Sequence, residues 1–388
     1  MIYLDAAVTQ ATTPDVRERM NQILSQTWGN VSGGHAVSRE AKDVLEKARE
    51  KVASICDVAP DKVVFTSGST EALNLVIQGY TNSHRDAKIF CSLTEHPAVY
   101  KTVKNLEEQG RVVVYIPVDN QGVLDENFFE NIQPGDLVCV MAVNNEIGVI
   151  NDLSKIAEVV KSKGAKLLVD AVQSFYTFLP NEITALADYI VFSGHKLGSP
   201  QGVGVLIIGD RKSISPINFG GSQEWELRPG TTPAFLCDSF AYVLEREVNS
   251  RQEAINNVVK CKKEFIDGLK ELVPDCLIHA ENAPTSPHVV SVHFEGIESQ
   301  MMLTMLDSRG VYVSKGSACA SGASTASRVL LSLGLEEERA QSTLRFSFSR
   351  HTDVEEVRQA AEIVADCVNQ LTRALLAGTM LAEGSPDV

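Results

Sequence analysis

Seven short apolar runs alternate with segments of helical length between about residues 60 and 210 of the chain. Each run is rich in β-branched residues and is apolar on both faces, as strands are when helices cover both sides of a mostly parallel sheet. This pattern predicts a large α/β domain whose ligand site lies at the carboxyl ends of the strands. The predicted strands cover residues 62–65, 88–91, 112–115, 137–141, 166–169, 189–192 and 203–208.

In the segments before and after these runs, the apolar residues have a different spacing. An amphipathic helix is predicted over 38–56, and one long helical stretch over 235–272. Further on, 289–294 and 343–348 alternate like half-buried strands, and we expect helices over 299–309 and 353–376. We therefore predict a second, smaller α+β domain. The large domain is assigned to 12–255, and the small one to 1–11 and 256–388.

Composition and charge narrow the class of protein. The 44% hydrophobic and 22% charged content is typical of a globular chain, and no run approaches the ~18 apolar residues of a membrane span. The net charge of −15 disfavours nucleic acid and anionic membranes as partners. We find no targeting leader and expect a cytoplasmic location. The eight cysteines form no C-x-x-C pair, so neither a metal site nor a disulfide framework is predicted.

Two candidate catalytic residues follow successive predicted strands. Lys196 comes shortly after the strand 189–192, where a lysine amine can form a covalent bond with an aldehyde cofactor. Asp170 ends the preceding strand, where a carboxylate can pair with a protonated ring nitrogen. Taken singly, a solvated lysine and a helix-capping aspartate are the simpler interpretations. The combination favours a cofactor site.

Other strand ends carry polar residues of suitable type. Ser69 and Thr70 lie at a predicted helix start, where hydroxyls and N–H groups can bind phosphate, although a capped helix explains them equally well. His96 follows the strand 88–91 and can stack on a ring or move protons, unless it only caps a turn. Asn145 follows the strand 137–141, where its amide can bind a ring hydroxyl or simply form a turn.

Cys319 lies in a run of small residues, unlike the other seven cysteines, which mostly lie in apolar or helical patterns. A thiol on such a loop can act as a nucleophile, although small residues around a cysteine can also indicate tight packing. Arg345 lies in the strand-like segment that follows, where a guanidinium can bind a carboxylate with two hydrogen bonds or form a structural ion pair.

In their order along the chain these residues resemble the NifS-like cysteine desulfurases, which are class-V aminotransferases and fold-type I pyridoxal-phosphate enzymes. The resemblance runs from Tyr3 to Thr352, and Ser222–Glu226 departs from the family's glycine-rich pattern. It rests on the segments Phe65–Glu71, Thr94–His96, Asn144–Gly148, Asp170–Ser174, Ser193–Lys196, Leu227–Thr231, Gly316–Cys319 and Leu344–Ser347.

The resemblance implies a role for each of these positions. Lys196 would bind pyridoxal 5'-phosphate covalently, Asp170 would pair with its ring nitrogen, and His96 would stack on the ring as an acid or base. Asn145 and Gln173 would contact the phenolic oxygen. Arg345, with Asn145, would bind the substrate carboxylate. The phosphate would be bound by Ser69, Thr70, Ser193, His195 and, from a second copy of the chain, Thr231.

The implied reaction converts L-cysteine to L-alanine and leaves a persulfide on Cys319 for an acceptor protein, a scaffold or a thiotransferase. The resemblance also implies a homodimer with shared active sites. Two alternatives remain open at this point. A selenocysteine or cystine lyase of the same fold would not need Cys319, and a scaffold that had lost catalysis would need none of these residues.

Overall fold

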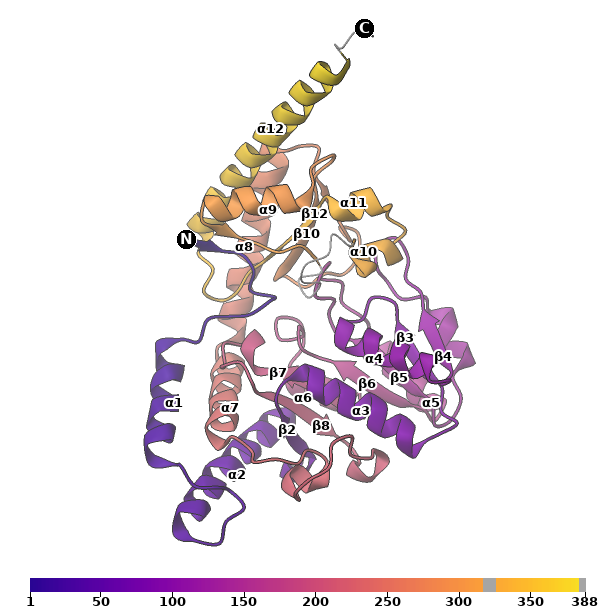
Figure 1. Ribbon diagram of the computed structural model, residues 1–388, viewed down its shortest axis with the longest axis vertical. Helices are drawn as coiled ribbons and strands as arrows, with labels where there is room; N and C mark the ends of the chain where they lie inside the picture. Colours follow the sequence, from indigo (N-terminus) through magenta and orange to yellow (C-terminus); the bar gives the residue numbers. More distant parts are fainter. Residues whose placement is uncertain (317–325, 384–388) are drawn as a thin grey trace.

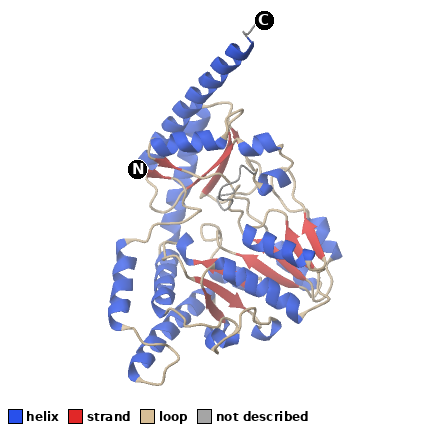
Figure 2. Cartoon of the chain, viewed as in Figure 1, coloured by secondary structure: helices blue, strands red, loops and turns tan. Residues whose placement is uncertain are grey.

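The computed structural model describes residues 1–316 and 326–383. Its strands form two groups, seen in red in Figure 2. The larger group is a seven-stranded sheet with the order β2-β8-β7-β6-β5-β3-β4. Strand β8 is antiparallel to β2 and β7, and the other neighbours are parallel. Its strands are β2 (Val63–Thr66), β3 (Ile89–Ser92), β4 (Val113–Ile116), β5 (Leu137–Met141), β6 (Lys166–Asp170), β7 (Tyr189–Ser193) and β8 (Gly204–Ile208).

Helices cover both faces of this sheet, because nearly every strand position is apolar and must be buried. On one face α3 (Ser69–Ser83) and α4 (Pro97–Glu108) pack against one set of strand side chains. On the other face, strand residues such as Phe65 and Phe192 share a core with helices α2, α5, α6 and α7. Those helices are α2 (Ala36–Cys56), α5 (Leu153–Ser162), α6 (Pro180–Thr184) and α7 (Ala234–Asn249). The predicted mostly parallel seven-stranded sheet is confirmed.

The smaller group of strands lies above the large sheet in Figure 1. It contains an antiparallel sheet with the order β12-β10-β9 and a parallel pair, β1 with β11. The strands are β1 (Ile2–Tyr3), β9 (Leu277–Ile278), β10 (Val289–His293), β11 (Val311–Tyr312) and β12 (Thr343–Ser347). The helices here are α8 (Arg251–Leu272), α9 (Ser299–Ser308), α10 (Arg328–Ser332), α11 (Glu337–Gln341) and α12 (Val354–Glu383), whose last turns extend away from the body (Figure 1).

Strands β10 and β12 correct one expectation, because both are buried on both faces rather than half-buried. Their apolar face packs on α8, where the Phe346 ring lies 4.6 Å from that of Phe265. Their polar face is covered from several parts of the chain. Ser347 Oγ accepts from the Ala7 N–H of the N-terminal segment (residues 1–11) at 2.9 Å, and Thr343 donates to Arg339 O at 3.0 Å. The alternating sequence pattern therefore reflects a polar but covered face.

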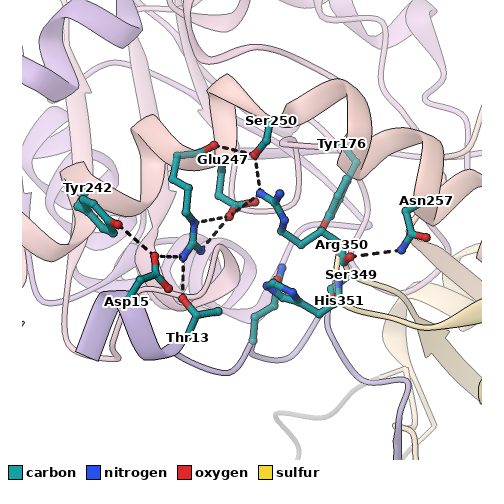
Figure 3. A network of polar contacts seen from close by, with 12 residues as sticks. Thr13, Asp15, Tyr176, Tyr242, Glu247, Ser250, Asn257, Ser349, Arg350 and His351 are labelled. Atoms are coloured by element: carbon teal, nitrogen blue, oxygen red, sulfur yellow. Dashed lines mark hydrogen bonds and ion pairs between the residues drawn. The ribbon is translucent and has the colours of Figure 1, made fainter. Parts of the chain in front are cut away.

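The predicted helical stretch over 235–272 is helical in the structure but forms two helices, because the chain breaks at Ser250 between α7 and α8. Ser250 Oγ donates to Arg246 O at 2.8 Å and accepts a hydrogen bond from Arg350 at 2.6 Å. Figure 3 shows the surrounding network, in which Glu247 accepts from both arginines and Asp15 accepts from Arg246. The network joins the start of α1 (Pro14–Gln26), the break between α7 and α8 and the turn after β12.

Five short 3-10 helices complete the described elements: η1 (Pro60–Lys62), η2 (Glu126–Asn131), η3 (Gly194–Lys196), η4 (Arg211–Ser213) and η5 (Gln223–Glu226). The large sheet lies within the predicted range 12–255, and the smaller sheets lie outside it. The domain boundaries themselves stay a prediction. Within 1–316 and 326–383, no helix is long and apolar enough to cross a membrane.

Candidate active site

A cavity of about 290 Å³ lies at the carboxyl ends of β5, β6 and β7, close to the small end of the range for ligand pockets. Its walls come from the N-terminal segment, the start of α3, the loops after four strands and Arg345 of β12. Nine of the predicted site residues line it: Ser69, Thr70, His96, Asn145, Asp170, Gln173, His195, Lys196 and Arg345. The strand-end prediction thus places most of the candidate residues around one cavity.

Lys196 is the last residue of η3, directly after β7. Its amine donates to Ala7 O at 2.8 Å and to Val8 O at 2.6 Å. The backbone carbonyl of Lys196 accepts from the Gln10 side chain at 2.5 Å. The N-terminal segment therefore holds both the backbone and the amine of this lysine at the cavity wall.

Asp170 ends β6 and is 5% exposed. Its carboxylate accepts from the Val172 N–H at 3.0 Å. Burial raises its pKa to about 6, while the Val172 N–H and the charge of Lys196 act in the opposite direction. A buried carboxyl of this kind gains stability from any cation that enters the cavity beside it.

His96 is the N-cap of α4, and its Nδ1 accepts from the Ala98 N–H at 3.1 Å. Burial, together with the charges of Lys196 and Arg328, lowers its pKa to about 4, so the ring is neutral near pH 7. A neutral imidazole that accepts at Nδ1 carries its proton on Nε2. The capping role and a chemical role are therefore compatible, since capping fixes the tautomer.

Gln173 lies in the turn after β6 and is 8% exposed. Its Nε2 donates to Ala7 O at 2.8 Å, and its Oε1 lies 2.9 Å from His288 Nε2. Asn145 lies in the turn after β5, where the Asn144 carboxamide oxygen accepts from the Glu146 and Ile147 N–H groups. Asn144 thus forms the turn that the sequence suggested, and Asn145 is left to line the cavity.

Arg345 is 2% exposed and points from β12 into the cavity. Its two terminal nitrogens donate to Asn145 O and to Asp5 Oδ1, both at 2.9 Å. Among the described residues, its buried Nε has no hydrogen-bond partner. Burial raises the pKa of Asp5, and Arg345 partly offsets that shift. The guanidinium is thus held at the cavity wall by two contacts.

The five predicted phosphate ligands lie in different places. Ser69 and Thr70 form the first turn of α3, whose N–H groups and partial positive charge suit an anion. His195 lines the cavity and contacts Thr9 Oγ1 at 3.2 Å. Ser193 is buried at the end of β7 and lines a smaller neighbouring cavity, and Thr231 is exposed on a loop outside both.

Cys319 lies outside the described residues, so its position relative to the cavity is not part of the geometry. Its segment is bordered by residues that contact the cavity wall. Gly316 lines the cavity, and a Cβ there would lie 2.5 Å from Glu146 Oε2. Ser327, on the other side, donates a hydrogen bond to the same Glu146 carboxylate. Gly316 and Ser327 therefore both lie next to the Glu146 carboxylate.

Three residues that help to form the site were not predicted. Asp5 and His288 each contact a cavity residue, and Glu146 itself lines the cavity, yet none was proposed for a role. Asp5 lies within the range of the resemblance and Glu146 within one of its segments, so their acidic side chains beside apolar runs were an available signal. His288 precedes a buried strand and offers no local pattern that separates it from a core histidine.

Comparison with known proteins supports the same class of enzyme. The aminotransferase class-V family model matches residues 2–359. "Putative cysteine desulfurase IscS 1" of Bacillus subtilis (strain 168) is 35% identical over 379 residues, which cover 96% of this chain and 99% of that protein. A solved "NifS-like protein" superimposes with a TM-score of 0.88 at 30% identity, covering 95% of this chain and 99% of the other. A structure titled "SspA in complex with cysteine" gives 0.78 at 27% identity, with coverages of 91% and 100%.

The chain therefore belongs to the class-V aminotransferase family and, within it, to the NifS-like cysteine desulfurases. This confirms the predicted family, the fold class and the prediction that the chain is an enzyme with cysteine desulfurase function. Class-V aminotransferases are pyridoxal-phosphate enzymes, which supports the predicted cofactor at the level of the class.

Proposed function

We propose that the cavity binds pyridoxal 5'-phosphate and L-cysteine and that the sulfur leaves as a persulfide on Cys319. The observation that carries this proposal is the pairing of Asp170 and Lys196 at the ends of adjacent strands, both lining one cavity with Arg345. A lysine amine, a buried carboxylate and a guanidinium are the groups that an aldehyde cofactor with a basic ring and an amino-acid substrate require.

The described residues fit the cofactor. The buried Asp170 carboxyl, whose pKa burial raises to about 6, suits a protonated ring nitrogen as its counter-charge. The first turn of α3 suits the phosphate, with Ser69 and Thr70 at the cavity wall. Gln173 and Asn145 would contact the phenolic oxygen, and His96 would stack on the ring. When bound, the cofactor supplies an electron sink for the carbanion at the substrate Cα.

The remaining steps belong to side chains of the chain. Arg345 would bind the substrate carboxylate at the cavity wall, with Asn145 beside it. The Lys196 amine would move the Cα proton once the substrate occupies the cavity, and neutral His96 would donate or accept a proton at Nε2. The Cys319 thiolate would attack the substrate sulfur. An S–S bond forms as the Cβ–S bond breaks, and the carbon keeps the bonding pair and is protonated to alanine.

The proposal includes two kinds of protein partner. Thr231 is exposed outside the cavity of its own chain, as it would be if it served the phosphate site of a second copy. We therefore propose a homodimer. A sulfur-acceptor protein, either a scaffold or a thiotransferase, would collect the persulfide, and a cytoplasmic location stays a prediction.

Two variants test the proposed chemistry. Lys196→Ala is expected to bind no cofactor covalently and to release no alanine from L-cysteine. Cys319→Ser is expected to keep the visible absorbance of the bound cofactor but to form no protein persulfide, measured by labelling with a thiol-reactive probe and mass spectrometry.

Cys276→Ser is the matched control, because Cys276 is buried away from the cavity and its substitution should leave persulfide formation intact. Full sulfur transfer by Cys319→Ser would contradict the role of that thiol and would favour a lyase that releases its product directly.

A further inference from the structure

A chain of hydrogen bonds runs from the segment before β10 to the cavity. His288 lies 2.9 Å from Gln173 Oε1 through its Nε2 and 2.6 Å from Ser286 Oγ through its Nδ1. Thr177 Oγ1 donates to Ser286 Oγ at 3.2 Å, and Gln173 Nε2 donates to Ala7 O at 2.8 Å. Five residues from three distant parts of the sequence are thereby joined.

Each hydrogen bond in this network can be assigned a donor and an acceptor without conflict. A carboxamide oxygen only accepts, so His288 Nε2 must carry a hydrogen toward Gln173 Oε1. Burial, with the charges of Lys262 and Arg345, lowers the pKa of His288 to about 3, so the ring is neutral and its Nδ1 accepts from Ser286. Ser286 Oγ can then accept from Thr177. Each donor has an acceptor, and none is used twice as a donor.

The His288 ring is fixed in place by its surroundings. It is 3% exposed, and the Tyr176 ring packs on it with centroids 4.9 Å apart. The preceding backbone is held by the Ser286 N–H, which donates to Gly148 O at 2.8 Å. An imidazole held in this way can fix the orientation of the amide that it contacts.

The orientation of the Gln173 amide decides what it offers to the cavity. A flipped amide would place its NH2 against the His288 N–H and its oxygen against Ala7 O, which are two unfavourable contacts. In the observed orientation Nε2 donates to Ala7 O, which also accepts from the Lys196 amine. The second hydrogen of Nε2 is therefore presented beside the amine that would carry the cofactor.

We propose that His288 is a positioning residue that holds the Gln173 amide with its nitrogen toward the cavity, so that it donates to the phenolic oxygen of the cofactor. The inference rests on the proposed function. It adds a residue that touches neither cofactor nor substrate and that comes from the segment leading into the smaller sheet.

The test uses His288→Phe, which keeps a ring against Tyr176 but loses the donor, and His288→Gln, whose Nε2 can replace it. A hydrogen bond donated to the phenolic oxygen makes that oxygen a weaker acceptor for the proton on the neighbouring nitrogen of Lys196. The donor therefore lowers the pKa of that nitrogen, and its loss should raise the pKa. In His288→Phe, the pH midpoint of the visible absorbance of bound pyridoxal phosphate is therefore expected to rise by about one to two units, the size of one hydrogen bond to a charged oxygen. His288→Gln should restore the midpoint.

His279→Phe is the matched control. His279 is a half-buried histidine after β9 that contacts Thr343 Oγ1 at 3.1 Å rather than a cavity residue, so its substitution should leave the midpoint unchanged. An unchanged midpoint in folded, cofactor-loaded His288→Phe, or an equal rise in both Phe variants, would overturn the positioning role. A wild-type protein with no visible band after addition of pyridoxal phosphate would instead overturn the proposed function, and this inference with it.

Discussion

Asp170 allows a quantitative prediction for the cofactor-free protein. Burial raises its pKa from 3.8 to about 6, so the native state holds a proton that the unfolded chain has already lost. The stabilising contribution of this group is therefore complete below about pH 4 and is lost as the pH rises through about 6. At 1.36 kcal/mol per unit, the ionised carboxyl costs about 3 kcal/mol of unfolding free energy at pH 8.

Asp170→Asn keeps the oxygen that accepts from the Val172 N–H and removes the buried charge. We expect the cofactor-free variant to be more stable than the wild type by about 3 kcal/mol at pH 8 but by only about 0.5 kcal/mol at pH 4. Urea unfolding at equal protein concentration measures the difference. The same variant should lose desulfurase activity, since the carboxylate would no longer oppose the ring nitrogen.

Asp136→Asn is the matched control for the chemical change. Asp136 is also buried, but its two oxygens accept from the Lys88 and Gln133 N–H groups, both at 2.8 Å, so an amide there should cost about 1 to 3 kcal/mol. A cofactor-free Asp170→Asn protein no more stable than the wild type at pH 8 would refute the argument that this site stores a destabilising charge for its ligand.

Two further substitutions have defined outcomes. Arg345→Lys should raise the KM for L-cysteine about 10- to 100-fold, because one ammonium cannot bind both Asp5 and the substrate carboxylate as a guanidinium can. An unchanged KM in steady-state assays would contradict the proposal that Arg345 binds the substrate carboxylate. Glu224→Gln should lower the unfolding free energy by about 3 to 5 kcal/mol in urea, since it removes the buried carboxylate 2.8 Å from the Arg49 guanidinium and leaves that cation with the more exposed Glu46, at 3.2 Å. The exposed neighbour Glu226→Gln should change stability by less than about 0.5 kcal/mol, and equal losses would show that the ion pair is not the cause.

The fold could be predicted where the pattern of apolar residues alone determines the element. Strands buried on both faces are continuous apolar runs, and the structure places β5 over the predicted residues 137–141 and β7 within one residue of its predicted end. The break at Ser250 could not be predicted, because it depends on Arg350, which is 100 positions away in the sequence. The burial of β12 was missed for the same reason, since Ser347 and Arg345 on its polar face contact Ala7 and Asp5, about 340 positions away.

The site residues also fall into those that the sequence could predict and those that it could not. Asp170, Lys196 and His96 could be found because parallel strands bring their carboxyl ends to one edge, so position in the sequence translates into position in space. Arg345 was proposed from its residue type, but its contact with Asp5 spans 340 positions and has no local pattern. His288 was missed because its role depends on the direction of hydrogen bonds, which spacing does not encode.

The N-terminal segment joins these two classes of residue. Ala7 O accepts from both Lys196 and Gln173, Asp5 accepts from Arg345, and Ala7 N–H donates to Ser347 of β12. The lysine and glutamine belong to the large sheet and the arginine to the smaller one, so a segment with no proposed chemistry of its own sets the distance between them. Because backbone carbonyls supply two of these contacts, side-chain substitution in the segment cannot remove them. The relative position of the groups proposed to bind cofactor and substrate therefore depends on where the backbone of the N-terminal segment runs. The types of the side chains that it contacts determine only the chemistry of each group.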